Sequence, residues 1–343
     1  MKPYTSRSLV TFGRASYIIL AWIVSVAATG QVSFAQSSLN DVHVTSTAKE
    51  SVPAKATTNS RSNSDSKPLK VDVDLVLVPV TVTDGMNRVV LGLDKTNFQV
   101  FENKHLQSVQ HFSNTDEPVS VGIIFDTSGS MKTKIDRAKE AVVEFMKTAN
   151  PQDEFFVIAF SDTPSELIDF TTSAEEVQNS LVLAVPRGTT ALLDAIYLGI
   201  GKMRQSKYTK KALLIISDGG DNHSRYSEQD VKRLVKESDS TIYAIGVYDQ
   251  YFATEEERLG PGLLGEISEL TGGRSFTIDN PKDLPEAANK IGVELRNQYV
   301  LGYHPSGSVR DGKWHKIKVK LLPPKGLPPL QLSAKQGYYA PDE

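Results

Sequence analysis

Hydrophobic residues recur at every second position over the first part of the chain that has a clear pattern. From Val71 the stretch "VDVDLVLVPVTVTDGMNRVVLGL" alternates apolar and polar residues, breaks at "DGMN" and resumes, which predicts a β-hairpin. Two further short strands are predicted in "FQVFEN" and "SVQHFS". The period of two therefore predicts a β segment over residues 70–116.

After Pro118 the pattern changes, because apolar strands now alternate with segments of helical spacing. The strands are 119–125, 154–161, 241–249 and 274–278, with another at the start of 211–222; the helices are 134–150, 173–184, 190–203, 227–238, 262–273 and 281–297. Such alternation predicts an α/β domain over residues 117–297, with a doubly wound, largely parallel sheet. Ligands of these sheets bind beyond the carboxyl ends of the strands.

The last part of the chain returns to strands. The period of two resumes in "QYVLGYHP", "WHKIKVKLLP" and "LQLSAKQGYYAP". The segments 70–116 and 298–343 are each small for an independent sheet domain, so we expect them to pair into one β-sandwich from which the α/β domain emerges. The alternative is two separate hairpin appendages.

The N-terminus has the pattern of a targeting segment. A basic leader precedes the apolar run of residues 17–30, and Ser33 and Ala35 suit cleavage by signal peptidase, so residues 1–35 are predicted to be a signal peptide. An uncleaved N-terminal anchor is the alternative. Residues 36–69 are rich in Ser, Thr, Asn and Lys, which predicts a disordered linker. We expect an exported protein, periplasmic or extracellular.

Composition excludes several kinds of chemistry. The chain has no cysteine, so disulfides, thiolate zinc sites and cysteine nucleophiles are excluded, and an exported protein of this kind is typical of bacteria. The formal net charge of −3 gives no general attraction to nucleic acid or to an anionic membrane. The "GPGLLG" at residues 260–265 fits a dinucleotide-binding pattern but follows a charged loop, so a helix-entry turn is the better interpretation.

Oxygen-bearing side chains gather where the predicted strands end. Asp126, Ser128 and Ser130 follow the first α/β strand in "DTSGS", Asp218 follows a later strand in "SDG", and Thr190 stands at the start of a helix in "GTTAL". Because these positions share the carboxyl edge of one sheet, the five side chains are expected to converge. Carboxylates and hydroxyls suit a hard divalent cation, so a site for Mg²⁺, with Mn²⁺ or Ca²⁺ as alternatives, is predicted.

The strand followed by "DTSGS", the later "GTTAL" and the "SDG" aspartate resemble the metal-ion-dependent adhesion site (MIDAS) of von Willebrand factor A (VWA) domains, in the same order and spacing. The flanks "DLVLVPVTVTD", "LRNQYVLGYHP" and "KQGYYAP" resemble the VWFA-related family found in Acidobacteria. The resemblance covers nearly everything after residue 70. It implies the five oxygen residues as metal ligands and a Rossmann-like fold.

Three functions compete at this stage. The leading prediction is an exported adhesion module, not an enzyme, that binds a protein partner because an acidic residue of the partner displaces water from the ion. A Mg²⁺-dependent hydrolase would need a base near the ion, and His223 is the obvious candidate. The third alternative is a structural envelope protein.

Asp194, Asp221 and Asn222 lie near the predicted ligands and are expected to support or cap the site rather than bind the metal.

Overall fold

The computed structural model of the chain describes residues 75–248, 255–306 and 310–342. The predicted signal peptide, residues 1–35, and the predicted linker, residues 36–69, lie outside the described residues. None of the helices within the described ranges combines the length and the apolar character needed to cross a membrane.

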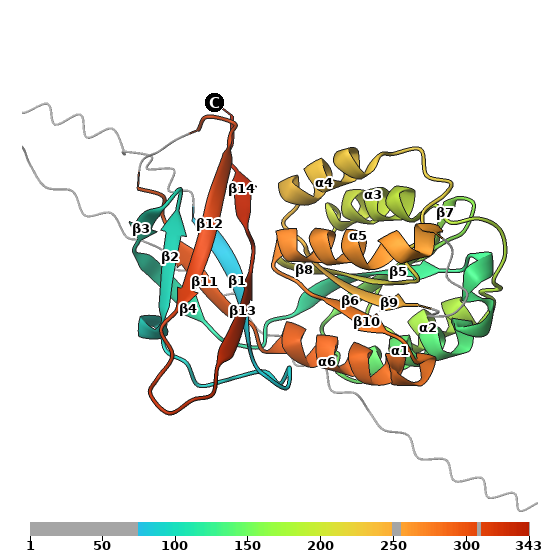
Figure 1. Cartoon of the computed structure of the whole chain (residues 1–343), viewed down its shortest axis with the longest axis horizontal. Helices are drawn as coiled ribbons and strands as arrows, with labels where there is room; N and C mark the ends of the chain where they lie inside the picture. Colours follow the sequence, from blue (N-terminus) through green and yellow to red (C-terminus); the bar gives the residue numbers. More distant parts are fainter. Residues whose placement is uncertain (1–74, 249–254, 307–309, 343) are drawn as a thin grey trace, which may run out of the picture. The chain divides into compact units, whose positions relative to one another are not determined.

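The α/β domain is built on a six-stranded sheet in which neighbouring strands are parallel except at one edge (Figure 1). The order is β10 (Ser275–Ile278), β9 (Thr241–Val247), β8 (Lys210–Ser217), β5 (Val119–Asp126), β6 (Glu154–Phe160) and β7 (Pro164–Thr171). The four strands β5, β6, β8 and β9 consist almost wholly of buried residues, because helices cover both faces. The predicted doubly wound, largely parallel sheet is confirmed.

Three helices pack on each face of this sheet (Figure 1). One face carries α1 (Ile135–Met146), α2 (Ala174–Val182) and α6 (Leu284–Arg296), and the other carries α3 (Leu192–Met203), α4 (Glu228–Glu237) and α5 (Glu255–Thr271). Short 3₁₀ helices occupy Lys95–Asn97, Gly129–Thr133 and Pro281–Asp283. The two apolar layers hold the strand ends in fixed positions, and those ends carry the candidate site.

The flanking segments form two further four-stranded sheets that share one apolar core (Figure 1). The first sheet has the order β13 (Leu330–Ala334), β1 (Val76–Asp84), β11 (Tyr299–Tyr303) and β4 (Val109–Ser113); the second has β14 (Gly337–Tyr339), β12 (Trp314–Leu321), β2 (Phe98–Glu102) and β3 (His105–Gln107). Antiparallel pairing of β1 with β11 and β13, and of β2 with β12, joins the two ends of the described chain. The predicted β-sandwich is confirmed.

Two local predictions need correction. The expected hairpin after Val71 is reduced to a short turn: Thr83 bridges Val89, and backbone hydrogen bonds run from Asp84 to Arg88 and from Val90 to Val82. Within the described residues no full second strand follows this turn, and β1 pairs along its length with the C-terminal strands β11 and β13. The "GPGLLG" segment is no helix-entry turn: it lies inside α5, which begins at Glu255 and contains Pro261. Both errors have the same origin: a local sequence pattern does not determine which strand pairs with which, or where a helix begins.

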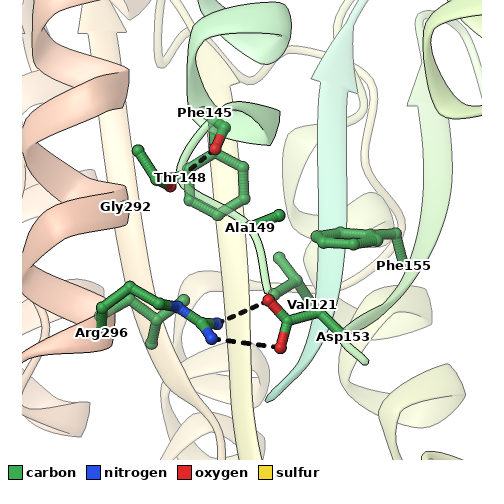
Figure 2. Close-up of a pocket in the computed structure, with 9 residues that line it drawn as sticks. Val121, Phe145, Thr148, Ala149, Asp153, Phe155, Gly292 and Arg296 are labelled. Carbon is green, nitrogen blue, oxygen red and sulfur yellow. Dashed lines mark hydrogen bonds and ion pairs between the residues drawn. The ribbon is translucent and has the colours of Figure 1, made fainter. Parts of the chain in front are cut away.

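The amino-terminal edge of the sheet holds a closed ion pair (Figure 2). Asp153, which precedes β6, accepts hydrogen bonds from the backbone N–H groups of Val119 and Asn150, each at 2.8 Å. Arg296 of α6 contacts both of its carboxylate oxygens, at 3.2 and 2.8 Å. Each oxygen therefore has two partners, and the carboxylate is fully satisfied although it is completely buried.

Candidate metal centre

The candidate site lies at the carboxyl ends of β5 and β8, the two central strands of the sheet. The chain leaves β5 toward β6 and β7 and then returns to β8 on the other side, so the strand order reverses between these neighbours. Open α/β sheets bind their ligands at such a reversal. Asp126 ends β5 and Asp218 follows β8, and both side chains are 0% exposed.

The loop after β5 is folded around Asp126. One carboxylate oxygen, Oδ1, accepts the backbone N–H of Ser128 at 2.8 Å, and the other, Oδ2, accepts the hydroxyl of Ser217 at 2.5 Å. The Ser128 and Ser130 hydroxyl oxygens lie 3.0 Å apart, in hydrogen-bond contact. Asp126 and Ser128 are buried and Ser130 is exposed. The three predicted ligands of this loop therefore extend from the buried end of the strand to the protein surface.

Asp218 is held less completely than Asp126. Its Oδ2 lies 3.4 Å from the ammonium of Lys134, whereas its buried Oδ1 has no hydrogen-bond partner in the part of the chain that the structure describes. A buried carboxylate oxygen without a partner is costly, because it has lost its water and gained nothing. Such an oxygen fits a position beside a bound cation.

The two carboxylates influence each other. Burial, and then the negative charge of Asp218, raise the pKa of Asp126 from 3.8 to about 7, although hydrogen bonds from Ser128 and Ser217 oppose the shift. The protein therefore holds two like-charged groups close together in a buried setting. With a divalent cation between them, the repulsion between the carboxylates would be replaced by the attraction of both to the ion.

Thr190 lies in a loop that touches both halves of the site. The same loop bonds to the serine loop, since Gly188 accepts the N–H of Gly129 and Thr127 accepts that of Arg187. Thr190 itself accepts the backbone N–H of Asn222, while its own N–H donates to the Asn222 side chain at 3.0 Å. These backbone contacts place buried Thr190 next to the loop that follows Asp218.

The neighbouring polar residues hold the loops in place. Asp194 accepts the N–H groups of Arg225 and Tyr226, and Asp221 accepts the N–H of Leu193 and the hydroxyl of Ser224. With Asn222 on Thr190, each of the three side chains is already used in bonding a loop. This bonding agrees with the supporting role expected for them.

A pair of glycines lets α5 approach the loop of Asp218. Gly219 has a φ of +76°, and a Cβ there would lie 2.6 Å from the Cα of Gly260. A Cβ on Gly260 would in turn lie 2.8 Å from the carbonyl oxygen of Asp218. Any larger residue at Gly219 would have an unfavourable φ and would clash with the backbone of α5. The glycine is therefore needed for the path that the chain takes directly after Asp218.

The residues present fit a hard cation. Asp126, Ser128, Ser130, Thr190 and Asp218 offer only oxygen donors, and the unpartnered Asp218 oxygen would give an ion a charged ligand. No cluster of three or more His, Cys, Asp or Glu side chains suited to a metal occurs in the described ranges, so any ion held here depends on hydroxyls as well as on the two carboxylates.

Two residues of the site were not anticipated from the sequence. Ser217 links the strand end to Asp126 and also accepts the N–H of Gly219 at 3.0 Å. Lys134 extends its ammonium into the site from the residue before α1. A signal for Lys134 was available, because residues 134, 138 and 142 share one helical face and the other two are apolar and buried.

Residues 121–220 match the von Willebrand factor type A domain family, and the chain therefore contains a VWA domain. An uncharacterized protein of Borreliella burgdorferi is 24% identical over 183 residues, which cover 46% of this chain and 53% of that protein. The chain thus spans about half the length of this curated relative.

Several solved structures are similar to the chain. A von Willebrand factor type A protein from Catenulispora acidiphila has 14% identity and a TM-score of 0.46, over 79% of this chain and 74% of that one. The vWF domain of the type V pili tip protein Mfa5 from Porphyromonas gingivalis has 14% identity and a TM-score of 0.42, over 51% and 94%. The conserved hypothetical protein BatB from Bacteroides thetaiotaomicron has 18% identity and a TM-score of 0.43, and the match covers 52% of this chain and 98% of that one.

Proposed function

We propose that this chain is an exported binding module whose VWA domain holds a divalent cation at the carboxyl edge of its sheet and engages a protein partner there. The observation that carries the proposal is the buried pair Asp126 and Asp218, one oxygen of which has no partner within the described residues. Around that pair stand hydroxyl oxygens, the neutral ligands that complete a hard-cation site.

The ligand set explains why a partner would bind. Ser128, Ser130 and Thr190 would contribute neutral oxygens. The protein would then supply at most two negative charges, those of its two carboxylates, to the dication. Mg²⁺ keeps water at positions that the protein does not fill, and such water can be displaced. When bound, the ion supplies an open coordination position for an anionic oxygen, so an aspartate or glutamate of the partner is the expected ligand.

Export is supported by the sequence of residues 1–35, which has the basic leader, apolar run and small-residue site of a signal peptide. The flanks' resemblance to the VWFA-related family found in Acidobacteria stays a prediction from the sequence. His223, the candidate base of the alternative hydrolase, is exposed, and its backbone N–H donates to Thr190. We do not assign it a catalytic role.

Calorimetric titration with Mn²⁺ and Mg²⁺ tests the metal site. The Asp126→Asn variant keeps the shape of the side chain and its capacity to bond Ser128 and Ser217, but it removes one charge. We expect it to bind the ions at least about a hundredfold more weakly, since the hydroxyls hold a strongly hydrated dication poorly. Asp136→Asn, an exposed position in α1, is the matched control and should titrate like the wild type.

Capture of partners from a bacterial envelope extract tests the binding role. Immobilised protein should retain a partner in the presence of Mg²⁺ and release it into EDTA, and Asp126→Asn should retain none. Retention that survives EDTA and the substitution would reject the metal-dependent mode, even if the ion binds.

A further inference from the structure

A buried lysine lies within the candidate metal site. Lys134 is only 5% exposed and stands between the 3₁₀ turn Gly129–Thr133 and helix α1. Its ammonium lies 3.4 Å from Oδ2 of Asp218 and donates a hydrogen bond of 3.1 Å to the backbone carbonyl of Val247. One side chain therefore connects the start of α1 with the ends of β8 and β9.

The position of this ammonium is unusual. Lysine is almost never fully buried without a partner of opposite charge, because its desolvation is costly. At this point the partner is one of the two carboxylates that would hold the ion, so the lysine occupies one side of Asp218 while the other oxygen stays unpaired. A second cation brought to Asp218 would meet the positive charge of Lys134 across the carboxylate.

We propose that Lys134 is an internal counter-cation of the metal site: it holds Asp218 in place when no ion is bound and lowers the affinity of the site for a divalent ion. The inference rests on the proposed metal site and adds a residue outside the five oxygen ligands. It also accounts for a lysine on a helical face whose next two positions, Ala138 and Val142, are both 0% exposed.

The charges of the site support this role. Without an ion, Lys134 beside Asp218 offsets part of the repulsion between the two buried carboxylates of Asp126 and Asp218. With an ion, the lysine becomes a like charge in a poorly screened, buried setting, where such interactions are strong. The ion is then held less tightly, and the loaded site is more attractive to an anionic oxygen of a partner.

A purely structural brace is the competing explanation. If Lys134 served only to tie α1 to β8 and β9, its loss would lower stability equally with and without metal. The affinity for the ion would then stay the same. The counter-cation role predicts the opposite sign for the affinity, so the two explanations are separable.

Lys134→Met preserves the length and packing of the side chain and removes its charge. In calorimetric titration with Mn²⁺ we expect this variant to bind at least about tenfold more tightly than the wild type. In EDTA its melting temperature should fall below that of the wild type, because the two carboxylates have lost the ammonium of Lys134. In excess Mn²⁺ the melting temperature should recover, so the difference between the melting temperatures with Mn²⁺ and with EDTA should be larger than in the wild type. Lys134→Gln, which stays polar, should change the affinity in the same direction by a smaller factor, and it provides the measurement if the methionine variant fails to fold.

Lys132→Met is the matched control, because this lysine is exposed in the same turn and its charge is screened by solvent and salt. It should leave the Mn²⁺ affinity within about twofold of the wild type. Unchanged or weaker Mn²⁺ binding by both Lys134 variants, with normal binding by the wild type, would overturn the counter-cation role alone. Failure of the wild type to bind either Mn²⁺ or Mg²⁺ would instead reject the proposed metal site.

Discussion

The two ends of the central sheet both bury aspartates, but they treat them differently. At the amino end, Asp153 makes four contacts: it accepts two backbone N–H groups, and both of its oxygens contact the guanidinium of Arg296. Figure 2 shows the pair with Arg296. At the carboxyl end, Asp218 shares one oxygen with Lys134 at 3.4 Å and leaves the other unpaired within the described residues. Both aspartate residues have an exposed fraction of 0%.

The difference separates a structural carboxylate from one suited to a ligand. Burial alone does not distinguish them, because the desolvation cost is similar at both ends. What distinguishes them is how completely the fold satisfies each carboxylate: both oxygens of Asp153 are bonded, whereas one oxygen of Asp218 has no partner within the described residues and the carboxylate of Asp126 is its neighbour. The comparison predicts that substitutions at the amino end change stability, and that those at the carboxyl end change ion binding.

The largest stability effect is expected at the amino end. Arg296→Met leaves Asp153 buried without its counter-ion, which should lower the free energy of unfolding by about 3–5 kcal/mol. Urea denaturation measures the loss, and Mn²⁺ affinity of the folded fraction should not change. Arg137→Met is the control, because Arg137 forms an exposed ion pair with Glu140 that should be worth about 1 kcal/mol or less. A loss at Arg296 no larger than at Arg137 would contradict the structural role.

At the carboxyl end, removing a buried charge should stabilise the protein at high pH when no metal is present, whereas at the amino end the loss of a charge destabilises it. Because the pKa of Asp126 is raised from 3.8 to about 7, its contribution to stability is fully present below about pH 4 and is lost as the pH rises toward 7. The loss could reach roughly 4 kcal/mol. Asp126→Asn should remove this part of the pH dependence, so the variant should equal or exceed the wild type in stability at pH 8 in EDTA. Parallel pH profiles for the two proteins would show that Asp126 is not perturbed.

A smaller effect is expected at the exposed rim of the site. Ser130→Ala removes one neutral oxygen that water can replace, so Mn²⁺ affinity should fall by roughly fivefold, on the order of 1 kcal/mol. The free energy of unfolding in EDTA should stay within about 0.5 kcal/mol of the wild type, since Ser130 is exposed. Thr133→Ala, also exposed in this turn, is the control for titration. A fall in stability without a change in affinity would place Ser130 outside the ligand set.

The sequence was most informative where burial is continuous. Strands such as β5 and β8 have long buried, mainly apolar runs, and their ends therefore located Asp126 and Asp218 at one edge of one sheet. The antiparallel edge strand β7, "PSELIDFT", was missed because none of its residues is buried and it has no clear apolar alternation. The hairpin after Val71 is only a short turn in the structure, because alternation shows which face of a strand is buried but not which strand lies beside it.

The candidate site was predictable in its oxygen residues and not in its supporting contacts. Carboxylates and hydroxyls after strands are visible in the sequence, whereas the bond from Ser217 to Asp126 and the reach of Lys134 to Asp218 depend on how β8 and α1 pack. The close approach of Gly219 and Gly260 likewise joins residues 41 positions apart through the path of α5. These contacts arise from tertiary packing, which no local pattern encodes.

Anomalous diffraction from crystals grown with Mn²⁺ tests the central claim most directly, namely that the carboxyl edge of this sheet is a metal site. We predict a manganese peak enclosed by the side-chain oxygens of Asp126, Ser128, Ser130, Thr190 and Asp218, and the loss of that peak in crystals of Asp218→Asn. The absence of a peak at this edge in the wild type, or an unchanged peak in the variant, would contradict the account.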